Sequence, residues 1–328
     1  MDIGQDVIDA VLAGNRRILA RAITLVESTR DDHRSKAVQL IDRLGQSKRS
    51  ALRIGLSGTP GVGKSTFTES FGMMLVEQGL KVAVLAVDPS SKRSGGSILG
   101  DKTRMDRLSR HPNAFIRPSP SSAALGGVAR RTREAIALCE AAGFDVILVE
   151  TVGVGQSEVM VADMTDLFLL LLAPAGGDEL QGVKRGIMEI ADLVLINKAD
   201  GELKSQAIRT CADYTGALRL LRKRVQDPKD FPKAMTISAL EEDGLEIVWE
   251  QIATLSEWRR NSGHFDANRV RQAQVWFEHE VRRGLFVQLE RNENLQNLQR
   301  DLAKQVAEGV VSSDAAAATV LRAFRTWE

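Results

Sequence analysis

The sequence has little of the chemistry that builds zinc sites and disulfide scaffolds. Its 328 residues include two cysteines, Cys139 and Cys211, and neither lies in a C-x-x-C motif or beside a histidine. The four histidines are scattered along the chain, so a metal site made of imidazoles is not indicated either. We therefore expect two reduced, buried thiols and no zinc-dependent or disulfide-linked architecture.

Neither a dominant charge nor a long apolar run is present. The formal net charge is +1, which argues against a general nucleic-acid or membrane surface. No apolar run approaches the ~20 residues that span a bilayer. The first residues are acidic and lack a basic region followed by an apolar one, so no signal peptide is expected. With 43% hydrophobic and 27% charged residues, the composition predicts a globular cytoplasmic protein without nucleic-acid or membrane partners.

The stretch from Leu52 to Thr66 matches the phosphate-binding template G-x-x-x-x-G-K-[ST]. An apolar run typical of a buried strand precedes it, and a helical pattern of apolar residues follows, which is the context that a P-loop requires. Glycines let the backbone wrap closely around a polyphosphate. We expect Lys64 to reach the β- and γ-phosphates and the Ser65 hydroxyl to bind Mg²⁺. The predicted loop comprises Gly58, Thr59, Pro60, Gly61, Val62, Gly63, Lys64, Ser65 and Thr66.

Strand and helix patterns alternate across residues 51–255. This alternation predicts an α/β fold, a P-loop NTPase with a mostly parallel sheet covered by helices on both faces. Residues 1–48 are predicted to form an N-terminal helical extension, 49–260 the P-loop domain, and 261–328 a C-terminal helical segment. Two interpretations of the last segment stay open: a helical cap on the main domain, or a dimerisation arm.

A second motif, N-K-A-D at residues 197–200, follows a predicted strand and matches the pattern of GTP-binding proteins. Guanine presents two donors on one edge, and an ionised Asp200 can accept both. Adenine would leave that carboxylate unpaired, so the motif predicts guanine specificity. Asn197 is expected to brace the loop, the Lys198 stem to cover the ring, and backbone N–H groups after the next strand to meet the guanine oxygen. The predicted guanine site comprises Asn197, Lys198, Asp200, Ser238, Ala239 and Leu240.

Acidic residues at other strand ends are candidates for catalysis. Glu150 follows a buried strand where P-loop proteins place an acid that orients Mg²⁺, and the Gly153 N–H can bond the γ-phosphate. Val154 occupies the place of the water-positioning glutamine of Ras-like proteins, so slow intrinsic hydrolysis is expected. Asp88 and Asp101 are candidates to hold Mg²⁺ or the attacking water, and for each the alternative is an ordinary loop acid.

Four stretches, GTPGVGKST, VAVLAVDPSSKRSGGSILGDKTRM, AGFDVILVETVGVGQSE and GDELQGVKRGIMEIADLVLINKAD, resemble one family. This family is the MeaB/ArgK-type G-protein chaperones of methylmalonyl-CoA mutase, whose fold is similar to the signal-recognition and nickel-insertion GTPases. The resemblance covers roughly residues 5–260, and its most specific part is DPSS…GGSILGDKTRM.

The resemblance implies a homodimeric GTPase that gates the loading of adenosylcobalamin, from its adenosyltransferase, onto the mutase and protects the mutase. It also implies that the Mg²⁺ and catalytic groups are Ser65, Asp88, Asp101 and Glu150 together with Lys64. A third, partner-reading switch is implied at residues 176–184, with Asp178, Gln181 and Lys184 as its polar members.

Two other functions fit the residues less well. A nickel-insertion GTPase would need a Cys/His cluster or a histidine-rich tail, and neither is present in the sequence. A P-loop kinase linked to amino-acid transport would need a lid for its acceptor and has no use for N-K-A-D.

Overall fold

The computed structural model describes residues 3–87, 105–118, 125–151, 157–174, 185–221 and 223–325. The chain forms two compact units, Met1–Asp266 and Ala267–Glu328. Among the described residues, no helix is both long and apolar enough to cross a membrane.

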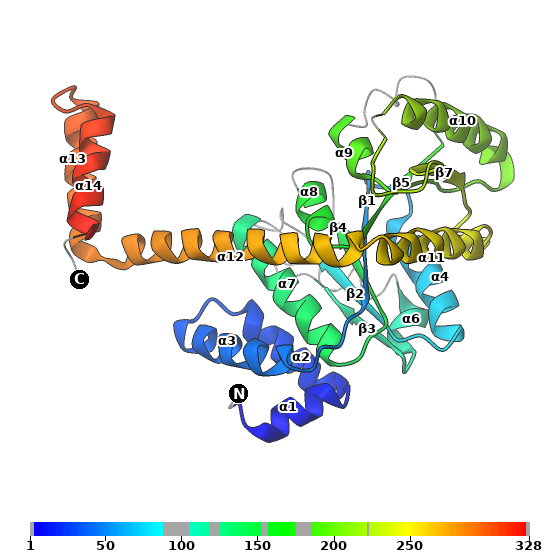
Figure 1. Cartoon of the computed structure of the whole chain (residues 1–328), viewed down its shortest axis with the longest axis horizontal. Coiled ribbons are helices and arrows are strands. Elements are labelled where there is room, and N and C mark those ends of the chain that lie inside the picture. The colour runs from blue at the N-terminus through cyan, green and yellow to red at the C-terminus, as the bar shows by residue number, and fades with distance from the viewer. Residues whose placement is uncertain are drawn as a thin grey trace. The chain divides into compact units, whose positions relative to one another are not determined.

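The first unit is built on a seven-stranded sheet with the order β3-β2-β4-β1-β5-β6-β7, in which every pairing is parallel (Figure 1). Its central strands are buried along nearly their whole length, which explains their continuous apolar runs. The predicted α/β fold with a parallel sheet is therefore confirmed. The strands are β1 (Leu52–Gly58), β2 (Val82–Val87), β3 (Ala114–Arg117), β4 (Val146–Thr151), β5 (Leu167–Leu172), β6 (Leu193–Ile196) and β7 (Lys233–Thr236).

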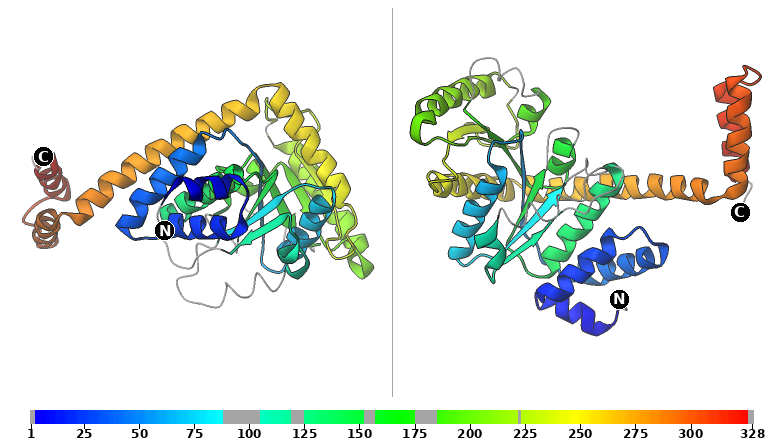
Figure 2. Two further views of the ribbon diagram at one scale, coloured as in Figure 1. Left: turned by 90° about the horizontal axis from the view of Figure 1, so that it is seen from below. Right: turned by 180° about the vertical axis from the view of Figure 1, so that it is seen from behind.

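Helices cover both faces of this sheet (Figure 2). On one face, Phe67 and Phe71 of α4 stack at 5.1 Å between ring centroids and pack into the same core as Ile54 and Leu56 of β1. Right-handed crossovers between parallel strands place the helices in this way. One face of the sheet carries α4 (Lys64–Glu77), α6 (Asp106–Arg110) and α11 (Leu245–Asn261). The other face carries α7 (Leu125–Ala141), α8 (Ser157–Ala162) and α9 (Arg185–Ile190). Helix α10 (Lys204–Leu220) follows the short turn η2 (Gly201–Leu203) and packs on β6 and β7.

Three N-terminal helices pack against α7 and belong to the same unit as the sheet: α1 (Gln5–Leu12), α2 (Arg16–Glu27) and α3 (Asp31–Gly45). Ion pairs join these helices to β3 and α7: Glu27 pairs with Arg117 of β3, and Arg34 pairs with Glu134 of α7. Arg49 donates to the carbonyl oxygens of Leu12 at 2.6 Å and Ala141 at 2.9 Å, so it fixes the chain where α1 and α7 end.

The C-terminal residues form helices, as predicted: α12 (His264–Arg291), α13 (Glu293–Ala307) and α14 (Ser313–Arg325). In the second unit α13 packs against α14, and Leu295 and Val320 are buried. Gly309 adopts a left-handed φ of 74° between them, and the Ser312 hydroxyl accepts from the Ala315 N–H at 3.3 Å. A left-handed glycine thus follows the end of α13, and Ser312 caps the N-terminus of α14.

Two element boundaries differ from the sequence prediction. The sequence pattern places the last strand at residues 236–238, but β7 begins at Lys233, whose N–H donates to the Asp192 carbonyl oxygen at 3.2 Å and so starts the pairing with β6. The sequence pattern places the next helix from Thr132, but α7 begins at Leu125, and Val128 is buried one turn before Thr132 and Ala135 on the same face.

Candidate nucleotide-binding site

The P-loop connects β1 to α4 and needs glycine at several positions. Gly61 and Gly63 have left-handed φ angles of 83° and 91°, which side chains with a Cβ rarely adopt. A Cβ on Gly58 would lie 2.3 Å from the carbonyl oxygen of Leu171 on β5, so this glycine allows β1 to approach its neighbour. Three glycines of the motif thus have direct structural reasons.

The N-terminus of α4 is suited to bind an anion. Gly63 is its N-cap residue, and no side chain in the described chain caps it. Its first N–H groups therefore keep their hydrogen-bonding capacity, and the helix dipole favours negative charge at this end. Ser65 and Thr66 lie in this first turn, where a hydroxyl can reach a phosphate-bound cation.

Lys64 folds back over the loop. Its Nζ donates to the carbonyl oxygens of Gly58 at 2.7 Å and Thr59 at 3.2 Å. Burial lowers the pKa of the Lys64 ammonium, and the negative charges of Glu150 and Glu158 oppose that shift. Phosphate oxygens are charged acceptors and form stronger bonds to an ammonium than carbonyl oxygens do. The side chain is therefore held beside the place where the β- and γ-phosphates are expected.

Glu150 lies near the carboxyl end of β4, opposite Leu56 of β1 and Ala86 of β2. Its carboxylate is buried and accepts a hydrogen bond from the Thr68 hydroxyl of α4 at 3.1 Å. This places a fixed carboxylate behind the first turn of α4. Serine hydroxyl and carboxylate oxygens are hard ligands of the kind Mg²⁺ prefers, so the donor groups of Ser65 and Glu150 fit this ion.

The N-K-A-D loop follows β6 and joins the P-loop directly. Asn197 is buried, its Nδ2 donates to the Val62 carbonyl oxygen at 2.8 Å, and its Oδ1 accepts from the Ala239 N–H at 2.9 Å. One side chain therefore links the P-loop, the N-K-A-D loop and the segment after β7. A Cβ on Gly63 would lie 2.7 Å from Asn197 Nδ2, so this glycine also makes room for the contact.

Lys198 and Asp200 are positioned by the same loops. Lys198 has a left-handed φ of 60°, and its Nζ donates to the Gly61 carbonyl oxygen at 2.7 Å. Asp200 is half-buried and accepts a hydrogen bond from the Ser238 hydroxyl. Ser238 thus orients the carboxylate expected to read guanine, while Leu240 is exposed beside it.

The comparisons with known proteins agree with this geometry. Residues 19–294 match the family described as "Methylmalonyl Co-A mutase-associated GTPase MeaB". The chain belongs to the MeaB family. A "Putative GTPase" of Caulobacter vibrioides is 53% identical over 96% of this chain and 95% of its own length, and "GTPase ArgK" of Escherichia coli is 46% identical over 91% and 90%.

Two further relatives extend the comparison. The mouse protein "Methylmalonic aciduria type A homolog, mitochondrial" is 48% identical over 96% of this chain and 78% of its own length. A solved structure, "Crystal structure of LAO/AO transport system kinase", superposes with a TM-score of 0.77 at 36% identity, covering 99% of this chain and all of that one. This MeaB-family protein is accordingly a P-loop GTPase, as the sequence predicted.

Two residues of the site do not emerge from the sequence patterns. Thr68 supplies the hydrogen bond to Glu150, and Glu158 is buried in the first turn of α8, where its charge acts on Lys64. Thr68 lies in no motif. Glu158 is the last residue of the family-like stretch AGFDVILVETVGVGQSE, and that resemblance is the sequence signal that could have identified it.

The remaining predicted residues lie outside the part of the chain that the structure describes. Their roles in metal binding, γ-phosphate recognition and partner reading stay predictions. They are Asp88, Asp101, Gly153, Asp178, Gln181 and Lys184.

Proposed function

We propose that this MeaB-family GTPase gates the loading of adenosylcobalamin onto a cobalamin-dependent acyl-CoA mutase, such as methylmalonyl-CoA mutase, and protects that mutase. The family description names association with methylmalonyl-CoA mutase. The mouse relative carries the name of methylmalonic aciduria. Both names support a mutase as the client, and a cobalamin adenosyltransferase is the expected donor of the cofactor.

The nucleotide chemistry assigns a role to each residue. Lys64 neutralises charge on the β- and γ-phosphates, and the first turn of α4 holds them with backbone N–H groups. Ser65 and Glu150, with Asp88 and Asp101, hold Mg²⁺ and its water ligands. When bound, the ion supplies positive charge to the phosphate oxygens and the leaving group. Asp88 or Asp101 positions the attacking water, since Val154 cannot.

Guanine selection is assigned to Asp200, with Ser238 as its positioning residue. The observation that carries the assignment is the pair of hydrogen bonds through Asn197, to Val62 and to Ala239. These bonds fix the base loop against the phosphate loop, so a nucleotide held by the P-loop presents its base to Asp200. The guanine-reading N-K-A-D motif favours a GTPase over the kinase activity for which the related solved structure is named.

Coupling to the mutase is assigned to residues 176–184, with Asp178, Gln181 and Lys184 as the partner-reading groups. This segment follows the buried strand β5 and leads into α9. We also assign the protein a homodimeric state, on the family resemblance, and a cytoplasmic location, on its composition and its two cysteines, which are expected to be reduced.

The gating role is tested by transfer of adenosylcobalamin from a loaded adenosyltransferase to the apo-mutase, followed by the cofactor's absorbance spectrum. The transfer should depend on this protein with GTP, and Lys64→Ala should abolish that dependence. In the same assay Gln181→Ala and Lys184→Ala should uncouple transfer from nucleotide while leaving GDP affinity unchanged. Transfer that proceeds equally with and without the protein, at every nucleotide state, would remove the chaperone assignment.

A further inference from the structure

A hollow of about 480 Å³ lies in the surface where α10 ends and β7 begins. Residues of α10, of β7 and of the loop between these two elements line this hollow. Because all strands of the sheet are parallel, the first residue of β7 lies at their amino ends, whereas the P-loop and the N-K-A-D loop lie at their carboxyl ends. The nucleotide site therefore does not account for this hollow, which we call the basic hollow.

The basic hollow has an apolar floor. Leu218 of α10 and Phe231 are both buried there, and Pro232 and Ala234 continue the apolar lining. The Lys233 ammonium lies 4.5 Å from the Phe231 ring centroid, donates to Gln251 at 2.6 Å and pairs with Asp230. The Lys233 ammonium is therefore already paired and adds no unpaired positive charge to the basic hollow.

The rim carries positive charge that the described chain does not neutralise. Arg219, Lys223 and Lys229 line the hollow and are exposed, and none of the three has a hydrogen-bond or ion-pair partner among the described residues. The acid among the described lining residues, Asp230, is already paired with Lys233. The surface is therefore complementary to a ligand that carries several negative charges.

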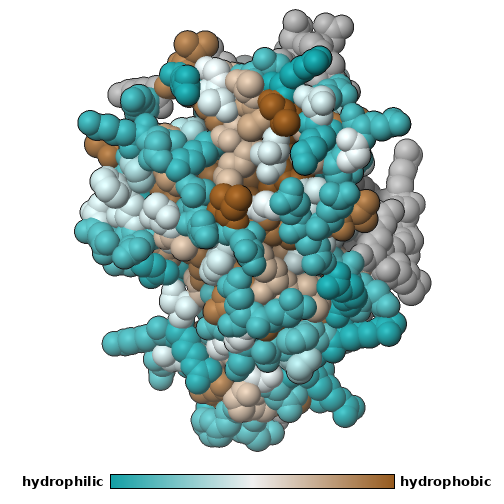
Figure 3. Space-filling model, turned by 90° about the vertical axis from the view of Figure 1, so that its right-hand side faces the viewer, coloured by the Kyte–Doolittle hydropathy of each residue, from teal (hydrophilic) through white to brown (hydrophobic). Residues whose placement is uncertain are grey.

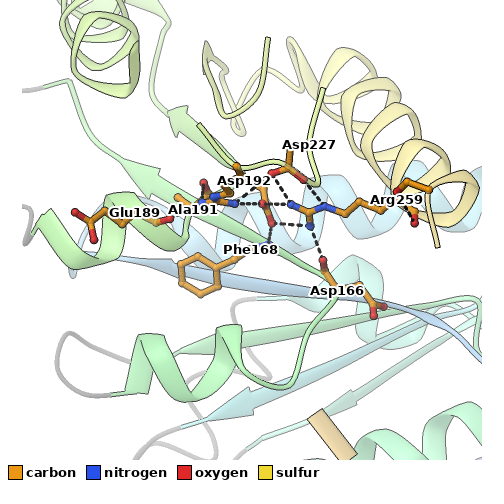
Figure 4. Close-up of polar contacts among 9 residues, drawn as sticks. Asp166, Phe168, Glu189, Ala191, Asp192, Asp227 and Arg259 are labelled. Atoms are coloured by element: carbon orange, nitrogen blue, oxygen red, sulfur yellow. Dashed lines mark hydrogen bonds and ion pairs between the residues drawn. The ribbon is translucent and has the colours of Figure 1, made fainter. Parts of the chain in front are cut away.

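Ion pairs and hydrogen bonds anchor the stretch between Lys223 and Lys229 to the rest of the first unit (Figure 4). Arg224 donates to the Asp192 carboxylate at 2.6 Å and to the Ala191 carbonyl oxygen at 2.8 Å. Asp227 accepts from Arg259 Nε at 2.8 Å and Nη2 at 3.0 Å, and Arg259 is buried. Because both anchors lie between Lys223 and Lys229, a ligand meets a preorganised loop and loses little affinity to ordering it.

Exposed apolar residues beside the basic hollow favour a protein over a small molecule. The side of the molecule that carries α10 and α11 is mainly hydrophilic, with scattered apolar side chains (Figure 3). Leu220 at the end of α10 is 87% exposed, and Val225 on the anchored loop is fully exposed. A small anion in the hollow would leave both in water. A protein segment can cover them, and an apolar centre within a charged rim is the usual arrangement of a protein interface.

We propose that the basic hollow is a docking site for an acidic segment of another protein. An apolar side chain of that segment packs on Leu218 and Phe231, and its carboxylates face Arg219, Lys223 and Lys229. Lysine ammonium groups act as point charges, so they can pair with carboxylates in varied orientations. The site is independent of the nucleotide and of the proposed mutase role.

The test is fluorescence polarisation of a short labelled peptide, a phenylalanine flanked by glutamates, titrated with the full-length protein at low salt. Saturable binding is expected, and it should weaken as the salt concentration rises because the rim charges are exposed. The double variant Arg219→Glu/Lys223→Glu should bind at least about tenfold more weakly, equivalent to ~1.4 kcal/mol. Arg209→Glu reverses an exposed charge on the same helix outside the hollow and should bind like the wild type.

Two control ligands decide between peptide docking and simple charge attraction. A peptide with serine in place of the phenylalanine should bind clearly more weakly, and inorganic tripolyphosphate should not displace the original peptide at equal charge concentration. Equal binding of both peptides, or displacement by tripolyphosphate, would show a small-anion surface and overturn the proposal. Absence of binding, or equal loss in Arg209→Glu, would also overturn it. Unchanged GTP turnover of the double variant establishes that its fold is intact.

Discussion

The side chain of Asn197 donates to the carbonyl oxygen of Val62 across 2.8 Å, and this bond joins the base-reading loop to the P-loop. The same amide accepts from the Ala239 N–H at 2.9 Å. The phosphate-binding and base-binding parts of the site are therefore one hydrogen-bonded assembly, although 135 residues separate Val62 from Asn197 in the chain.

Replacing Asn197 by alanine should weaken GTP and GDP binding together. The change leaves a buried carbonyl and a buried N–H unpaired, and each such loss costs about 1–3 kcal/mol. We expect at least about a tenfold loss of affinity for both nucleotides, measured by titration with fluorescent GDP and GTP analogues. Leu240→Ala, at an exposed neighbour whose side chain holds neither loop, is the control and should lose much less. A loss confined to GTP would contradict a role in joining the loops.

Replacing Asp200 by asparagine should change base preference rather than abolish binding. The carboxylate offers two acceptors to the guanine N–H groups, whereas the amide offers one acceptor and one donor, which suits xanthine. We expect weaker GDP binding and stronger XDP binding, compared in one competition assay. Ser238→Ala removes the hydroxyl that holds Asp200 and should weaken GDP binding without favouring XDP. Equal affinity of the wild type for ADP and GDP would refute the base assignment.

Replacing Thr68 by valine should slow hydrolysis while GDP affinity changes little. Valine keeps the shape but removes the hydroxyl that donates to Glu150, so the buried carboxylate loses one hydrogen bond and its orientation. A hydrogen bond to a charged group is worth about 1.5–3 kcal/mol, so a fall in kcat of about tenfold or more is expected. Thr68→Ser restores the donor and should recover most of the rate. If Thr68→Ser stays as slow as Thr68→Val, the loss of rate comes from altered packing and not from the missing hydroxyl.

Nucleotide binding should decline at alkaline pH earlier than an ordinary lysine would allow. Burial lowers the pKa of Lys64 from 10.5, and phosphate binding requires its ammonium form. GDP affinity should therefore fall as pH rises through the lowered pKa. The stability of the nucleotide-free protein should change in the opposite direction. Because the fold favours the neutral amine of Lys64, the free energy of unfolding should increase as pH rises from the lowered pKa toward 10.5.

Lys64→Arg provides the control for this pH dependence, because a guanidinium stays charged across the whole range. GDP affinity measured across the same alkaline range should decline less in this variant than in the wild type. An identical decline in both proteins would show that another group, and not Lys64, titrates.

Much of the fold follows from local patterns in the sequence. Buried parallel strands such as Val82–Val87 and Leu167–Leu172 are uninterrupted apolar runs in the sequence. No strong apolar pattern predicts helix α10. Its buried residues have helical spacing but include small and polar side chains, so they form no clear apolar stripe: Ala207, Thr210, Tyr214 and Leu218.

The residues of the candidate site also fall into those that local motifs predict and those that only the fold brings together. The P-loop and the N-K-A-D loop are contiguous motifs, so their residues could be assigned without knowledge of the fold. The partners Thr68 and Glu150, 82 residues apart, meet because β4 lies beside β1, which no local pattern records. The buried pairing of Arg259 with Asp192 and Asp227 depends on the sheet order for the same reason.

The most direct test of the proposed GTPase–client coupling is GTP turnover by the purified protein, measured with and without an adenosylcobalamin-dependent mutase from the same cell. We predict slow turnover of GTP alone, little turnover of ATP, and acceleration when the mutase is added, with Lys64→Ala inactive in every condition. Each tenfold acceleration corresponds to ~1.4 kcal/mol off the barrier. Turnover that no such mutase changes would contradict the proposed coupling between this GTPase and its client.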